Sequence, residues 1–183
     1  MNVNKKIINK LLEEIPKIKF PKVKRACLWD NYRQYSGKKR NPKTGKYPMD
    51  WKKFGSRLAE TIYFGYSKYG KELDTNKDYE TIFNILNKLA IKNNIPFTGL
   101  SISRNLICKK HKDTYNTGNS HILFLGNFKN GDLYFEDGKV INKKNKIFSF
   151  DSKKKHWNNP KLVPTKYSII WYIHTNLKDK IIS

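Results

Sequence analysis

Two histidines and an aspartate carry the clearest chemical signal in this chain of 183 residues. His111 and Asp113 form the motif HKD directly after an apolar stretch that reads as a strand. Side chains two residues apart on an extended segment point to the same face, so the two could hold one ion together. His156 follows another such stretch, KIFSFD, and could supply a third ligand. Two imidazoles and one carboxylate leave three positions open on an octahedral ion, which is typical of non-haem Fe(II) oxygenases.

A basic residue and a serine follow the second histidine. Lys166 lies ten residues past His156, and Ser168 shares a face with it if the stretch KYSIIWYIH is a strand. A cation and a hydroxyl on one face could bind a carboxylate together. Arg104 and Asn105, on the stretch that leads to the HKD motif, are further candidates for contacts in the pocket. Only one of these two can point inward, because successive residues of a strand face opposite ways.

The elements that must position these residues change in type along the chain. Helical spacing of apolar residues predicts helices over 4–15 and 78–93. After Pro96 the period becomes two, which predicts strands over 99–108, 120–126, 132–137, 146–150 and 166–174. Asn130-Gly131 and Asp137-Gly138 are typical of two-residue hairpin turns. Helices followed by antiparallel strands indicate an α+β fold, a jelly roll with N-terminal helices packed on one face.

The order of the motifs resembles that of the Fe(II)/2-oxoglutarate-dependent oxygenase superfamily. The resemblance covers about residues 98–172 and consists of HxD, a distal histidine, and a basic residue two positions before a serine. In detail, HKDTYNTGNS, the NGDL turn and the ending TKYSIIWY are similar to the branch that contains the TET and J-binding-protein enzymes. Those enzymes oxidise the methyl group of 5-methylpyrimidines in nucleic acid. The resemblance implies a double-stranded β-helix core. From chain length, composition and periodicity we expect a single domain, 1–183, divided into a basic extension (1–57), a helical support (58–97) and the core (98–176).

The resemblance also implies the cofactors. His111, Asp113 and His156 would hold Fe(II), and Lys166 with Ser168 would bind the distal carboxylate of 2-oxoglutarate. Ascorbate is a candidate reductant. Decarboxylation of 2-oxoglutarate to succinate and CO₂ would then be coupled to hydroxylation of a substrate C–H bond.

The basic residue departs from the pattern of that branch, whose members usually carry arginine where this chain has Lys166. Lysine at this position is typical of prolyl 4-hydroxylases, and it offers a point charge in place of a bidentate fork. A prolyl or lysyl protein hydroxylase is therefore an alternative. A non-catalytic module that binds nucleic acid through a basic jelly roll is a second alternative.

The charge balance points to an anionic partner. The chain has 38 lysines and arginines against 15 acidic residues, a net charge of +23, so nucleic acid is the first candidate. The stretch 32–51, YRQYSGKKRNPKTGKYPMDW, interleaves basic and aromatic residues, which can follow phosphates and stack on bases. The same stretch could instead be a surface loop whose aromatic residues cap the core.

The two cysteines and the lengths of the apolar runs bear on the cellular compartment, on metal binding and on membrane insertion. Cys27 and Cys108 show no paired spacing, which disfavours a disulfide framework and favours an intracellular compartment. Cys108-x-x-His111 could suggest zinc, but a structural zinc site needs four ligands and no second close pair exists in the sequence. No apolar run approaches the roughly 18–20 residues of a membrane span, and no secretory signal is visible. The sequence leaves the oligomeric state open.

Overall fold

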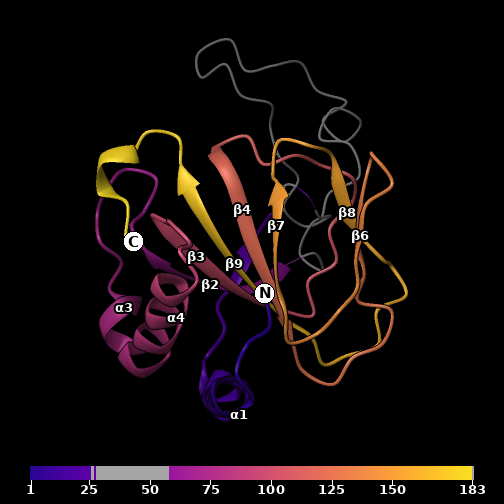
Figure 1. Ribbon diagram of the computed structural model, residues 1–183, viewed down its shortest axis with the longest axis horizontal. Helices are drawn as coiled ribbons and strands as arrows, with labels where there is room; N and C mark the ends of the chain where they lie inside the picture. Colours follow the sequence, from indigo (N-terminus) through magenta and orange to yellow (C-terminus); the bar gives the residue numbers. More distant parts are fainter. Residues whose placement is uncertain (26, 28–57, 183) are drawn as a thin grey trace.

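The computed structural model describes residues 1–25, 27 and 58–182 and consists of two antiparallel sheets and a layer of helices (Figure 1). The larger sheet has six strands in the order β1-β2-β3-β9-β4-β7, and the smaller sheet has three in the order β6-β5-β8. The strands are β1 (Lys22–Lys24), β2 (Leu58–Gly65), β3 (Gly99–Arg104), β4 (Asn116–Leu125), β5 (Leu133–Phe135), β6 (Val140–Ile141), β7 (Ile147–Asp151), β8 (His156–Asn158) and β9 (Tyr167–His174).

The helices cover one face of the six-stranded sheet. Helix α1 (Lys5–Glu14) and helix α4 (Glu80–Lys92) confirm the two helices expected from the spacing of apolar residues. Their buried side chains, among them Leu11 and Leu86, share one core with alternate residues of the strands, including Trp171. A short helix α3 (Thr75–Asp78) and two 3-10 turns, η1 (Ile15–Lys17) and η3 (Lys178–Lys180), complete the helical elements of the described residues.

The opposite face of the large sheet packs against the small sheet through a second apolar cluster. Phe124 of β4 and Phe150 of β7 meet Phe135 of β5 there. The alternation along β9 divides its side chains between the two cores: Ile169 belongs to the helix-covered core, whereas Ile170 packs against the cluster between the sheets. The molecule therefore has three layers, and polar residues on the inner faces of the sheets lie between two walls of strands.

The structure differs from the sequence-based expectation in the stretch 58–97, which was expected to support the core with helices. Its first part is strand β2, which pairs with β3 from Glu60↔Arg104 to Gly65↔Gly99. Both faces of β2 are covered, since Thr61 is as fully buried as Phe64. A strand that is buried on both faces lacks the polar–apolar alternation by which strands are recognised in a sequence.

The two expected hairpin turns have different outcomes. Asp137-Gly138 lies in the turn between the paired strands β5 and β6, and Gly138 has a φ of 83° there. Asn130-Gly131 does not close a hairpin, because β4 and β5 belong to different sheets. The stretch 32–51 lies outside the described residues. Within the described part of the chain, no helix is long and apolar enough to cross a membrane.

Candidate metal centre

Backbone pairing brings the two histidines together. His111 and His156 form an antiparallel bridge, in which the His111 amide donates to the His156 carbonyl at 3.0 Å and the His156 amide donates back at 2.8 Å. Two residues on, the Asp113 amide donates to the carbonyl of Ser152 at 2.9 Å. His111 therefore lies on an extended segment beside the start of β8, and Asp113 follows it two positions later, as the HKD spacing predicts.

The ligand atoms of His111, Asp113 and His156 converge on one point. All three lie within 4.8 Å of one another, close enough to surround a single ion. Nε2 of His111 is 3.7 Å from Oδ1 of Asp113, and the centroids of the two imidazole rings are 4.4 Å apart. The ring of His156 is buried against Phe135 and Phe150, at centroid distances of 5.8 and 5.6 Å.

Local hydrogen bonds fix the tautomer of both imidazoles. Nδ1 of His111 is 2.7 Å from the carbonyl oxygen of Lys109, and Nδ1 of His156 is 2.9 Å from that of Lys154. A carbonyl oxygen only accepts, so each Nδ1 carries the proton and each Nε2 keeps its lone pair. This is the arrangement that histidine ligands adopt when a second partner orients the ring. Both rings are thus prepared to bind a cation through Nε2.

The charge state of the centre also suits a metal ion. Burial, together with the neighbouring imidazole of His156, lowers the pKa of His111, which keeps the ring neutral near pH 7. Nδ2 of the Asn116 side chain donates to Oδ2 of Asp113 at 3.2 Å, which leaves Oδ1 directed at His111. Bound to an ion through Nε2, two imidazoles and one carboxylate would form a ligand set with a single negative charge.

Lys166 is among the largest fully buried side chains of the described residues, with 1% of its surface exposed. Its ammonium group lies 3.9 Å from the ring centroid of Phe124 and donates to the carbonyl of Gly131. Within the described part of the chain, no carboxylate lies within ion-pair distance of it. Burial lowers the pKa of Lys166 from 10.5 to about 8.

Ser168 lies beside Lys166 on the same face of the sheet. It is buried, and it is paired with Phe124 of β4 and with Ser103 of β3. Asn105 holds the backbone directly before β9, because its side-chain oxygen accepts from the backbone N–H of Lys166 at 2.8 Å and its own backbone N–H donates to the Lys166 carbonyl at 2.8 Å. Asn105 thus acts on the backbone of Lys166.

Arg104 is engaged away from the three metal-ligand candidates. Its guanidinium donates to both carboxylate oxygens of Glu60 on β2, at 2.7 and 2.8 Å, and lies 5.0 Å from the ring centroid of Phe20. Its register partner Tyr167 belongs to the helix-covered core. The alternation of the strand therefore directs Arg104 away from Ser103 and Ser168.

A cavity of about 240 Å³ adjoins Asp113 and contains residues that the sequence did not single out. Arg25, Tyr63 and Tyr115 line it together with Tyr172. Nη1 of Arg25 is buried and has no hydrogen-bond partner among the described residues. No motif could have marked Arg25, since it follows β1 in the most basic part of the chain and reaches the site only through the pairing of β1 with β2.

Comparisons with known proteins bear on the fold. No protein-family model matches the sequence, and no curated protein sequence matches it. Among solved structures, the chain is similar to NgTET1 in complex with 5mC DNA, with a TM-score of 0.56 and 15% sequence identity over 97% of this chain and 71% of the NgTET1 chain. At that level of identity the similarity establishes a shared overall fold, and the activity has to be argued from the site.

Proposed function

We propose that this protein is an Fe(II)- and 2-oxoglutarate-dependent dioxygenase that hydroxylates a C–H bond of a modified pyrimidine base in nucleic acid. The observation that carries the proposal is the convergence of His111, Asp113 and His156 with both Nδ1 atoms held by backbone carbonyls. Three ligands on one side of an ion leave room for a co-substrate and dioxygen. The two sheets would form the walls of a double-stranded β-helix, or jelly roll, around this centre.

The residues present fit Fe(II). His111 and His156 would each bind through Nε2, and Asp113 through the oxygen that faces His111. The carbonyls of Lys109 and Lys154 would keep the rings oriented whether or not the ion is bound. Bound iron would supply the oxidising chemistry that couples decarboxylation of 2-oxoglutarate to hydroxylation of the substrate.

Lys166 and Ser168 are the proposed site for the distal carboxylate of 2-oxoglutarate. A buried ammonium group with no carboxylate partner among the described residues is costly to the fold unless an anion joins it. Gly131 already accepts one of the three N–H donors of Lys166, so the other two can turn to a ligand. Phe124 and Phe128 lie next to the ammonium and would exclude water from the ion pair, which strengthens it.

The surroundings of the centre favour nucleic acid as the substrate. Both histidines lie within runs of exposed lysines that would attract phosphates: Lys109, Lys110, Lys112, Lys153, Lys154 and Lys155. The cavity beside Asp113 is lined by tyrosines, on which a base could stack. A base in a duplex would have to be flipped out to reach this cavity, at a cost of a few kcal/mol. The similar structure of NgTET1 was solved with 5mC DNA.

One feature favours a second candidate substrate. Lysine in place of arginine at position 166 is typical of prolyl 4-hydroxylases, so a prolyl or lysyl protein hydroxylase is the alternative. The lysines around the centre would then bind the acidic side chains of a peptide substrate.

Succinate release that depends on a substrate separates these candidates. The purified protein would be supplied with Fe(II), ascorbate and 2-oxoglutarate and given methylated DNA, methylated RNA or proline-rich peptides in parallel. The proposal expects release with methylated nucleic acid, a weaker response to the same unmethylated sequence, and none in Asp113→Ala. Succinate release that only the peptides stimulate would show that the substrate is a protein and not nucleic acid. If no substrate is turned over and the protein does not bind Fe(II), the oxygenase assignment is wrong. The remaining candidate is then a non-catalytic module that binds nucleic acid.

A further inference from the structure

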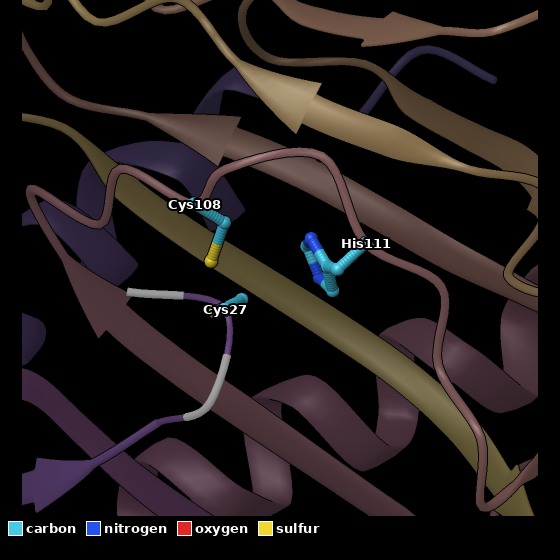
Figure 2. Close-up of side chains that lie close together, drawn as sticks. All are labelled: Cys27, Cys108 and His111. Atoms are coloured by element: carbon cyan, nitrogen blue, oxygen red, sulfur yellow. The ribbon is translucent and has the colours of Figure 1, made fainter. Parts of the chain in front are cut away.

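A second group of metal-binding side chains shares His111 with the proposed iron centre. Cys27, Cys108 and His111 place one ligand atom each within 4.8 Å of one another. Figure 2 shows both cysteines beside the imidazole, with the sulfur of Cys108 directed toward Cys27. Both cysteines are free of disulfide bonds, and their sulfur atoms lie within 4.8 Å of each other. Two sulfurs and one imidazole nitrogen therefore surround one point next to the three proposed iron ligands.

Backbone hydrogen bonds hold this group in place. The carbonyl of Cys27 accepts from the Lys109 amide at 3.0 Å, which ties the segment after β1 to the segment that carries Cys108. The Cys108 amide donates to the side-chain oxygen of Asn158 at 2.9 Å, and its carbonyl accepts from the Asn158 amide at 2.9 Å. His111 is fixed in turn by its bridge to His156. Strand β8 thus holds Cys108 and His111, and the segment that follows Cys108 holds Cys27.

We propose that Cys27, Cys108 and His111 form a second metal site, which takes a thiophilic divalent ion of the Zn(II) class and thereby withdraws His111 from the iron centre. Thiolate ligands select zinc over iron(II) and magnesium, which prefer sets richer in oxygen and nitrogen. Three protein ligands of the Cys₂His type, with water in the fourth position, form a known tetrahedral zinc environment. Binding would release the two thiol protons and form a site with no net charge, as two thiolates balance the divalent ion.

The surroundings provide access and a fourth ligand. Cys27 and His111 both line a cavity of about 330 Å³, through which an ion and a water molecule could enter. Cys108 is buried behind them, with 4% of its surface exposed. The ion would therefore lie at the inner wall of the cavity, with the open position toward solvent.

Occupation of the two sites is mutually exclusive. Nδ1 of His111 is committed to the carbonyl of Lys109, which leaves a single ring nitrogen for a metal. An imidazole that binds the thiolate-held ion is lost to Asp113 and His156, which alone are a poor site for iron. The existence of the thiolate site is independent of the proposed function, whereas its inhibitory consequence rests on it.

Cobalt(II) provides the test, because thiolate coordination adds a sulfur-to-cobalt charge-transfer band that histidine and carboxylate ligands do not give. The metal-free protein would be titrated with Co(II) under a phosphine reductant, which keeps both thiols reduced. We expect one bound ion and a charge-transfer band in the wild type. Cys27→Ser and Cys108→Ser should lose the band and still bind one ion at the remaining triad, which also shows that they are folded. Asp113→Ala is the matched control and should retain the band.

Three results would overturn the inference. These are a wild type without the band, a band that persists in Cys27→Ser, and two ions bound at the same time, since the last would mean that His111 is not shared. The outcome is separable from that of the proposed function. A protein that releases succinate and shows no thiolate band fails only the second site, and a protein with the band and no turnover fails only the oxygenase assignment.

Discussion

Replacing Lys166 with methionine should stabilise the metal-free fold while removing its affinity for 2-oxoglutarate. Burial lowers the pKa of this lysine from 10.5 to about 8, a difference that corresponds to about 3 kcal/mol of unfavourable free energy in the charged state. Methionine has a similar length and no charge, so it avoids that cost. It also loses the hydrogen bond to the Gly131 carbonyl and the contact with the Phe124 ring, each worth about 1 kcal/mol. The free energy of unfolding of Lys166→Met should therefore exceed that of the wild type by about 1 kcal/mol at pH 7.

The dependence on pH has a definite sign. The folded-state pKa of Lys166 is below its unfolded value, so the folded state binds fewer protons between pH 8 and 10.5. The free energy of unfolding contributed by this group therefore rises with pH across that window and is lowest below pH 8. Lys166→Met should lack this rise. Urea denaturation of both proteins at pH 7 and pH 10 measures the difference, and the pairwise comparison cancels the titration of other groups.

Binding of 2-oxoglutarate should change in the opposite direction. Truncation of one partner in a buried charge pair costs about 2–5 kcal/mol, so the dissociation constant should rise by about thirtyfold or more in Lys166→Met. In the wild type, affinity should weaken as the pH passes about 8, because the ammonium loses its proton. Isothermal titration of the metal-loaded protein with 2-oxoglutarate measures both effects.

A lysine on the exposed face of α4 supplies the control. Lys88→Met changes the same net charge and should leave the affinity for 2-oxoglutarate unaltered. The reasoning fails if Lys166→Met binds 2-oxoglutarate as the wild type does, since the carboxylate site would then lie elsewhere. A variant that is less stable than the wild type at pH 7 would show that the packing of the lysine stem outweighs the cost of its buried charge.

Three further outcomes follow from the same geometry and charge. Asp113→Asn should abolish Fe(II) binding and iron-dependent succinate release, because an uncharged amide replaces the only carboxylate of the triad; circular dichroism checks that the fold remains. Arg104→Ala should destabilise the fold by about 1 kcal/mol, since its bidentate ion pair on β2 is 33% and 29% exposed, and a raised KM for 2-oxoglutarate would contradict this purely structural role. Neutralising Lys38, Lys39 and Arg40 should reduce the log–log salt slope of nucleic-acid binding by up to about three units; an unchanged slope would place the phosphate contacts elsewhere.

The metal-ligand candidates could be inferred from the sequence because their geometry is largely local. The i, i+2 spacing of His111 and Asp113 fixes their common face wherever the segment is extended. The apolar stretch before His156 predicts β7, and the imidazole then enters from the next strand. The sequence did not predict the hydrogen-bond partner of each Nδ1, because a hydrogen bond to a backbone carbonyl does not depend on residue type.

The second group could not be found in the same way. Cys27 lies 81 residues before Cys108 in the sequence, and the absence of a second close pair argued against zinc. Their proximity arises from the sheet, because β1 pairs with β2 and β2 pairs with β3, so the segments that leave β1 and β3 end near one another. Spacing rules apply within one helix or strand, so they do not predict contacts that arise from the order of strands in a sheet.

The alternation of side chains along a strand was also insufficient to predict the contacts at the end of β3. It states that Arg104 and Asn105 face opposite ways, but it does not say what each side meets. In the structure, Arg104 meets Glu60 of the unexpected strand β2, and Asn105 meets the backbone of Lys166, directly before β9. The contribution of the stretch 32–51 stays a prediction, because it lies outside the described residues.

The same hydrogen bond occurs twice at the proposed iron centre, and this repetition explains how the backbone orients both histidine ligands. Each histidine follows at least two lysines, and each Nδ1 donates to the carbonyl two residues before it. The two backbones then exchange a pair of hydrogen bonds between His111 and His156, so the rings lie next to each other, with their planes tilted by 57°. The orientation of both Nε2 atoms is thus fixed by folding. Little conformational entropy remains to be lost on metal binding, which favours affinity. A ring nitrogen of His111 also lies within 4.8 Å of the sulfurs of Cys27 and Cys108, so this imidazole borders two groups of ligands.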